Sequence, residues 1–144
     1  MAFKEPKRLT VRQPPFLIYI VDDDEDDLLF ISNAFKEIGL ENVCKGFLSA
    51  DDLFQDLKFN ATSHLPDAIV LDYEMPKMNG KEVLKKLIRI PDFENIPFIF
   101  YSDNLAPELE TELKNLGAAC CIKKGVTTKD QQKVANQIID ILKK

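Results

Sequence analysis

Five short apolar runs, each followed by a segment with helical periodicity, constrain the fold of this chain more than any other feature. The runs occupy residues 16–21, 43–48, 68–71, 97–101 and 119–122. Runs of this length that hold few polar residues are typical of strands covered on both faces. Strands that alternate with helices build βαβ units around a parallel sheet. The sequence therefore predicts one α/β domain over residues 16–144.

Five helices are predicted from apolar positions that recur every three or four residues and from residues that favour helix ends. Glycines suit the C-termini of helices, and a proline suits the first turn. Residues 59–66 are predicted to form a loop. The expected ends are Asp26 and Gly39 for the first helix, a Ser49 cap and Leu57 for the second, Gly80 and Pro91 for the third, Pro107 and Gly117 for the fourth, and a Thr128 cap for the fifth.

The net charge of −5 is distributed unevenly along the chain. Four basic residues and one acidic residue give residues 1–15 a charge of +3, which leaves −8 for the remainder. An acidic body is a poor partner for nucleic acid. Residues 1–15 also contain three prolines, and we expect them to form a flexible leader ahead of the domain.

Cysteine content and hydropathy bear on the cellular compartment. The chain has three cysteines, two of them adjacent, and this odd number favours reduced thiols over a disulfide framework. No apolar run approaches the roughly 20 residues of a membrane span, and the N-terminus lacks an apolar signal segment. We therefore expect a cytoplasmic protein without a membrane partner. A single histidine and the absence of a Cys-x-x-Cys pair argue against a zinc site.

Polar side chains follow four of the five apolar runs. Asp22, Asp23 and Asp24 come directly after the first run and Asp72 after the third, while Ser102 and Lys124 follow the fourth and fifth. The carboxyl ends of parallel strands meet at one edge of a sheet, where ligands bind in open α/β folds. Packed carboxylates repel one another unless a cation or protons offset their charge. A hard cation such as Mg²⁺, which prefers oxygen ligands, suits this cluster.

Four stretches of the sequence form a recognisable pattern: Ile20–Asp24, Ile69–Pro76 with Gly80, Ile96–Ser102, and Gly117–Ala118 followed by Lys124. Taken in order, these stretches resemble the receiver domain of bacterial two-component response regulators, over about residues 16–143. The resemblance implies a flavodoxin-like (βα)5 fold, a doubly wound parallel five-stranded sheet with strand order 2-1-3-4-5. With no effector segment after residue 144, a single-domain protein similar to the chemotaxis regulators is expected.

The resemblance implies that Asp72 accepts a phosphoryl group. Ser102 would donate its hydroxyl to a phosphoryl oxygen, and Lys124 would pair with the carboxylate before transfer and with the phosphoryl group after it. The donor would be a sensor histidine kinase or a histidine phosphotransfer protein. The output would be a phosphorylation-dependent contact with a downstream protein, produced by a shift between two conformations.

The resemblance also implies a metal site next to Asp72. Asp22, Asp23 and Asp72 would bind Mg²⁺, with Mn²⁺ as an alternative, and the backbone carbonyl of Glu74 would supply a further oxygen. The ion would bridge the acceptor carboxylate and a phosphoryl oxygen. The chain would assist only its own phosphorylation and dephosphorylation, so no enzyme is expected. A monomer or a weak homodimer is expected.

Three positions depart from the pattern that the family commonly has. Gly125 follows Lys124 where a proline is common, so a looser loop is expected. Cys121 stands where an aromatic ring often reports phosphorylation, so no ring can rotate there. Asp103 follows Ser102 where a very small residue is usual, and its carboxylate is expected to slow phosphorylation by small donors.

Two other functions are compatible with parts of the pattern, and a third is excluded. A receiver-like adaptor that is never phosphorylated would use the fold only for binding. A phosphatase of the haloacid dehalogenase type would use an aspartate after the first strand as its nucleophile, and Asp22 and Asp24 fit its Asp-x-Asp motif. However, Glu25 stands where an apolar residue or threonine is expected. The chain also has no room for the cap that is usually inserted in such phosphatases. A calcium loop starting at Asp22 is excluded because Asp27 and Asn33 occupy the positions of its glycine and glutamate.

Overall fold

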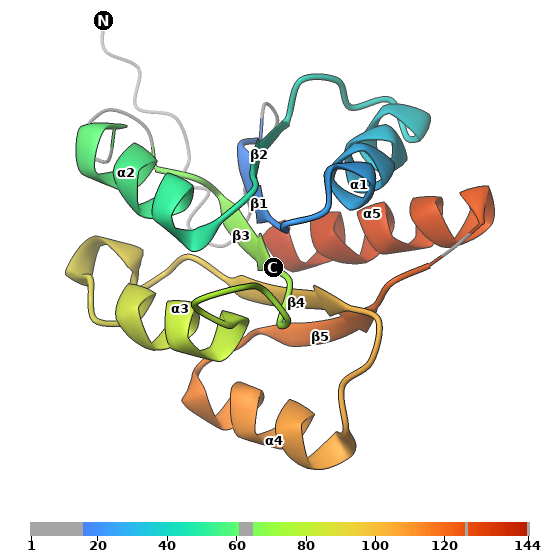
Figure 1. Ribbon diagram of the computed structural model, residues 1–144. Coiled ribbons are helices and arrows are strands. Elements are labelled where there is room, and N and C mark those ends of the chain that lie inside the picture. The colour runs from blue at the N-terminus through green and yellow to red at the C-terminus, as the bar shows by residue number, and fades with distance from the viewer. Residues whose placement is uncertain (1–15, 61–64, 126, 144) are drawn as a thin grey trace, which may run out of the picture.

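The computed structural model describes residues 16–60, 65–125 and 127–143, so the predicted leader over residues 1–15 lies outside the described residues. Strands and helices alternate along the whole described chain (Figure 1). The elements are β1 (Ile18–Val21), α1 (Glu25–Glu37), β2 (Cys44–Phe47), α2 (Ala50–Asn60), β3 (Ala68–Leu71), α3 (Gly80–Leu87), the 3₁₀-helix η1 (Pro91–Phe93), β4 (Phe98–Ser102), α4 (Pro107–Leu116), β5 (Cys120–Lys123) and α5 (Thr128–Leu142).

The strands form one parallel sheet in the order β2-β1-β3-β4-β5, which confirms the predicted topology. Successive side chains of a strand point to opposite faces, and both faces are covered. Ile18 and Ile20 of β1 pack in the cluster formed with α1 and α5. Tyr19 and Val21 pack in the cluster formed with α2, α3 and α4. Two apolar cores therefore enclose β1, β3 and β4, as their apolar runs predict. The edge strand β2 differs from the prediction, because Lys45 and Gly46 are exposed.

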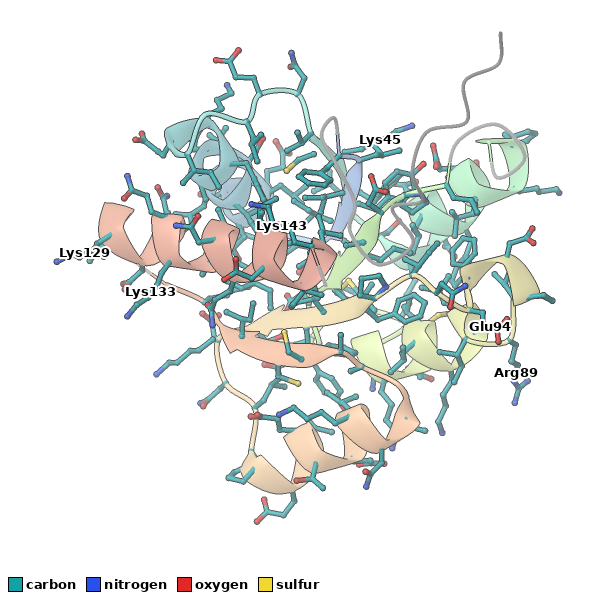
Figure 2. The ribbon with its side chains drawn as sticks, turned by 180° about the vertical axis from the view of Figure 1, so that it is seen from behind. Lys45, Arg89, Glu94, Lys129, Lys133 and Lys143 are labelled. Carbon is teal, nitrogen blue, oxygen red and sulfur yellow. The ribbon has the colours of Figure 1, made fainter. Side chains whose placement is uncertain are left out.

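The outer face of α5 is charged. Lys129 and Lys133 point away from the sheet (Figure 2) and are exposed, while Ile138 and Leu142 are fully buried beneath the helix. This division into an apolar and a polar side is the amphipathic pattern from which the helix was predicted. In the described part of the chain, no helix is both long and apolar enough to cross a membrane.

Side chains that accept hydrogen bonds from the first turn determine where α1 and α5 begin. Asp24 accepts from the N–H of Asp26 at 2.8 Å, so α1 begins one residue before the predicted start. Thr127, and not the predicted Thr128, caps α5, because its hydroxyl accepts from the N–H of Asp130 at 3.1 Å. Each cap satisfies a backbone donor that has no partner within the helix.

The ends of α2 and α3 also differ from the prediction. Ser49 accepts from the N–H of Asp52 at 3.1 Å, as predicted for a cap. However, α2 continues to Asn60 and includes the first two residues of the predicted loop, because no glycine or proline interrupts the pattern there. By contrast, α3 ends at Leu87, ahead of Pro91, which begins η1 instead. The helical pattern already changes before the proline, because the N–H groups of Arg89 and Ile90 donate to carbonyls only three residues back.

The loop between β3 and α3 is held tightly against the end of β3. The N–H of Gly80 donates to the carbonyl of Tyr73 at 2.7 Å. A Cβ atom at Gly80 would lie 2.6 Å from both the carbonyl oxygen of Asp72 and the ring of Phe100. Only glycine permits this approach. The close packing positions the backbone that follows Asp72.

Candidate functional site

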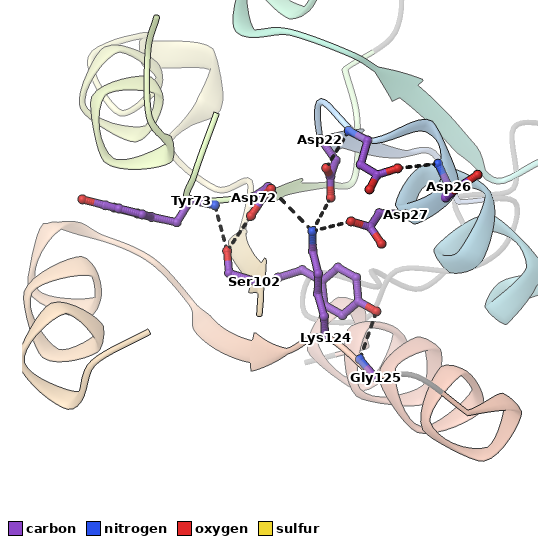
Figure 3. A network of polar contacts seen from close by, with 10 residues as sticks. Asp22, Asp26, Asp27, Asp72, Tyr73, Ser102, Lys124 and Gly125 are labelled. Atoms are coloured by element: carbon purple, nitrogen blue, oxygen red, sulfur yellow. Dashed lines mark hydrogen bonds and ion pairs between the residues drawn. The ribbon is translucent and has the colours of Figure 1, made fainter. Parts of the chain in front are cut away.

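The carboxyl ends of four strands bring four of the predicted site residues together at one edge of the sheet (Figure 3): Asp22, Asp72, Ser102 and Lys124. Val21 of β1 is in register with Leu71 of β3, so Asp22 and Asp72 leave adjacent strand ends. The N–H of Asp72 donates to the carbonyl of Val21 at 2.9 Å. This parallel pairing is the reason why acids distant in sequence become neighbours.

Asp72 lies at the centre of the cluster and is 8% exposed. Its Oδ1 accepts a hydrogen bond from the Ser102 hydroxyl at 2.8 Å. The Ser102 oxygen in turn accepts from the N–H of Tyr73 at 2.8 Å, which orients the hydroxyl toward the carboxylate. The Oδ2 of Asp72 lies 3.4 Å from the ammonium nitrogen of Lys124. The predicted residues Asp72, Ser102 and Lys124 therefore meet.

Lys124 is bound more closely by two acids of the β1–α1 segment than by Asp72. Its Nζ lies 2.7 Å from Asp22 Oδ2 and 2.8 Å from Asp27 Oδ2. Its side chain is only 6% exposed. Asp27 was not among the predicted site residues. The only signal in the sequence is that the acidic run continues into the first helical turn, where acids are also common because they favour the positive end of a helix.

Burial and hydrogen bonding have opposite effects on the pKa of Asp22 and on the pKa of Lys124. Burial raises the pKa of Asp22 to about 6, although hydrogen bonds from Lys124 and the backbone of Asp24 act to lower it. Burial lowers the pKa of Lys124, but hydrogen bonds to Asp22 and Asp27 outweigh it and the net pKa is raised. The Lys124 ammonium therefore stays charged, and burial dominates at Asp22, whose side chain is 3% exposed.

Three of the predicted metal ligands are close enough to share an ion. Oxygens of Asp22, Asp23 and Asp72 all lie within 4.8 Å of one another. Asp22 and Asp72 are buried, and Asp23 is exposed. A set of carboxylate oxygens that is short of positive charge suits a hard divalent cation such as Mg²⁺ or Mn²⁺. Glu74 lies on the loop after β3 with an exposed side chain, and the role of its carbonyl stays a prediction.

The unusual glycine after Lys124 has two structural consequences. The N–H of Gly125 donates to the Tyr101 hydroxyl at 3.4 Å, a bond that proline could not make. A Cβ atom at Gly125 would collide with the Cβ of Asp130. The loop after β5 is therefore hydrogen-bonded to β4. The greater mobility expected for this loop stays a prediction. Cys121 is half-buried and Asp103 is exposed; the effect of Asp103 on small donors stays a prediction as well.

The chain is similar to proteins of one known family. Residues 18–136 match the response regulator receiver domain family. The chain is 25% identical over 128 residues to Response regulator Rcp1 of Synechocystis sp., and the match covers 87% of each protein. It is 38% identical over 86 residues to Response regulator protein TmoT of Ectopseudomonas mendocina, covering 60% of this chain and 36% of that one. The chain thus matches about a third of the length of TmoT.

The fold is also found among solved structures. The crystal structure of the Mn²⁺-bound form of response regulator Rcp1 superposes with a TM-score of 0.73. The two chains are 23% identical, and the match covers 86% of this chain and 91% of Rcp1. At this identity the likeness concerns the fold alone.

Proposed function

Since the chain belongs to the response regulator receiver domain family of two-component systems, we propose that it accepts a phosphoryl group on Asp72 from a sensor histidine kinase or a histidine phosphotransfer protein. The phosphorylated form then signals in the cytoplasm by contact with a downstream protein. Receiver domains are signalling domains and not classical enzymes. One observation carries the proposal: a buried carboxylate at the end of β3 lies between a hydroxyl at 2.8 Å and an ammonium at 3.4 Å.

The hydrogen bonds of the two buried acids favour Asp72 over Asp22 as the acceptor. Asp22 Oδ1 accepts from the N–H of Asp24 at 3.0 Å, and its Oδ2 accepts from Lys124 at 2.7 Å. Asp72 Oδ2 has the weaker 3.4 Å contact with Lys124. An oxygen with less engaged lone pairs is the better nucleophile. This comparison weighs against a phosphatase that would use the aspartate after β1.

Transfer exchanges one bond to phosphorus for another. The bond between phosphorus and a donor imidazole nitrogen breaks, the nitrogen keeps the electron pair, and an oxygen of Asp72 bonds to phosphorus to form an acyl phosphate. The in-line arrangement places negative charge on the three equatorial oxygens. Ser102 can turn its O–H from Asp72 to one of them, and Lys124 can offset the charge of another.

The acidic cluster next to Asp72 would hold the metal. Asp22, Asp23 and Asp72, with the backbone carbonyl of Glu74, would bind Mg²⁺ or Mn²⁺. When bound, the ion offsets the negative charge that the carboxylates and the phosphoryl group share. The Mn²⁺-bound form of Rcp1 supports this choice of metal for a related fold.

Incubation with acetyl phosphate and Mg²⁺ followed by a phosphate-affinity gel tests the proposal. The parent protein is expected to give one retarded species that disappears with EDTA. Asp72→Asn should give none, whereas Asp140→Asn, which alters an exposed aspartate of α5, should behave as the parent. Absence of any retarded parent species, even with a panel of histidine kinases as donors, would favour the unphosphorylated adaptor. Repeated turnover of p-nitrophenyl phosphate would instead indicate a phosphatase.

A further inference from the structure

We propose that Asp27, on the first turn of α1, is a positioning residue that holds Lys124 toward α1 and competes with the phosphoryl group of Asp72 for it. The inference rests on the proposed function, because it concerns what Lys124 must give up when Asp72 is phosphorylated. The inference extends the site by one aspartate of α1, Asp27, which contacts neither the phosphorus atom nor the reacting oxygen.

The contacts of Lys124 are asymmetric. Its ammonium group has three N–H donors, and the two short contacts, at 2.7 and 2.8 Å, lead to Asp22 and Asp27. The contact with Asp72 is 3.4 Å long. Figure 3 shows Asp27 and Asp72 on opposite sides of the ammonium group. In this state Lys124 is therefore drawn away from the acceptor carboxylate.

Both ends of the Asp27–Lys124 contact are anchored. The N–H of Asp27 donates to the carbonyl of Asp24 at 3.1 Å within the first turn of α1. Farther along that helix, Phe35 is fully buried in the cluster shared with α5. The N–H of Lys124 donates to the carbonyl of Ser102 at 2.9 Å. Because neither backbone is free to follow, movement of the ammonium toward Asp72 must lengthen its contact with Asp27.

Phosphorylation changes the balance between these two attractions. An acyl phosphate places more negative charge beyond Asp72 than the carboxylate does, so its attraction for Lys124 increases. The carboxylate of Asp27 opposes that movement, since its side chain is two-thirds buried and poorly screened by water. Removing its charge should therefore favour the state in which Lys124 contacts the phosphoryl group.

Beryllofluoride, a mimic of the phosphoryl group, provides the test. The full chain is titrated with beryllofluoride by calorimetry in saturating Mg²⁺. Asp27→Asn should bind it about three- to tenfold more tightly than the parent, the range expected for one partly buried charged hydrogen bond. Asp27→Glu, which restores the charge, should return to within about twofold of the parent. Asp26→Asn removes an exposed charge one residue away and should also stay within about twofold.

Repeating the titration in a Lys124→Gln variant distinguishes an effect of Asp27 that acts through Lys124 from a general effect of charge on beryllofluoride binding. In Lys124→Gln, Asp27→Asn should no longer change beryllofluoride binding. A gain that persists without the ammonium, an equal gain in Asp26→Asn, or no gain in Asp27→Asn overturns the inference. If the parent itself binds no beryllofluoride and is not phosphorylated by any donor, the proposed function fails instead.

Discussion

Lys124, at the carboxyl ends of the strands, and Lys45, on the edge strand β2, both pair with aspartates, but the balance of charge around them differs. Within the described residues Lys124 is in contact with the carboxylates of Asp22, Asp27 and Asp72, and its side chain is 6% exposed. Lys45 pairs there with Asp56 at 2.6 Å, and its side chain is 49% exposed. The site around Lys124 thus has a surplus of negative charge that water screens only in part.

Among the residues that the structure describes, the Lys45 site is balanced, because its buried acid accepts hydrogen bonds from two donors. Asp56 Oδ1 accepts from Lys45, and its Oδ2 accepts from the Tyr19 hydroxyl at 2.6 Å. The Lys45 ammonium also lies 6.0 Å from the ring centre of Tyr19 and 5.7 Å from that of Phe47, within range of a cation–π attraction. These contacts connect α2 to β1 and β2. Among the described residues, the positive charge of Lys45 is paired with the negative charge of Asp56.

The comparison indicates what each site is for. A balanced cluster stabilises the fold, because burial of its polar groups is offset by their bonds. A surplus of carboxylates reduces stability because like charges repel. Burial, with a smaller contribution from the charge of Asp72, raises the pKa of Asp22. Such a conflict is expected where function requires it. Substitutions should therefore have opposite signs in the two sites.

The largest effect is expected at the balanced site. Asp56→Ala should lower the free energy of unfolding by about 2–3 kcal/mol, because the buried Tyr19 hydroxyl loses its acceptor and the charge pair is broken. Urea denaturation measures the change. Gln55→Ala, an exposed neighbour on α2, should change the same free energy by no more than about 0.5 kcal/mol. Equal effects of the two substitutions would remove the distinction drawn here.

A smaller effect that depends on pH is expected for Tyr19→Phe. Burial and the bond to Asp56 raise the pKa of the Tyr19 phenol above its ordinary value. The folded phenol keeps its proton while the unfolded one loses it near pH 10, so the stability due to this group is complete below that pH and is lost above it. Tyr19→Phe should cost about 1 kcal/mol at pH 8.

The pH dependence of Tyr19→Phe is measured by urea curves at pH 8 and pH 11. The parent should lose more stability over this interval than the variant, so that the difference between them shrinks. A constant difference would mean that the bond from Tyr19 to Asp56 contributes nothing that depends on ionisation.

The smallest effect, of opposite sign, is expected in the surplus site. Asp23→Asn in EDTA should raise the free energy of unfolding by about 0.5 kcal/mol, because one of the crowded carboxylates loses its charge. The same variant should lose most of the rise in melting temperature that Mg²⁺ produces in the parent. Thermal unfolding with and without Mg²⁺ measures both. A destabilised Asp23→Asn with an unchanged response to Mg²⁺ would show that the acids are not in surplus.

The sequence alone determined which segments form the strands and which acids follow them. Apolar runs and the polar residues at their ends are local features, because a strand covered on both faces requires an uninterrupted apolar stretch. The sequence therefore predicts that five polar residues lie at one edge of the sheet: Asp22, Asp23, Asp72, Ser102 and Lys124. The resemblance to a family then supplied their expected roles.

The tertiary structure alone decided which acids Lys124 and Lys45 contact. Lys124 reaches Asp27 as well as the predicted Asp72, and Asp56 bonds Tyr19, 37 residues away in the sequence. In the sequence, Asp27 and Asp56 cannot be distinguished from the exposed acids of the same helices. Their partners depend on how α1 and α2 pack beside the sheet, and packing over such separations has no signature in local periodicity or charge.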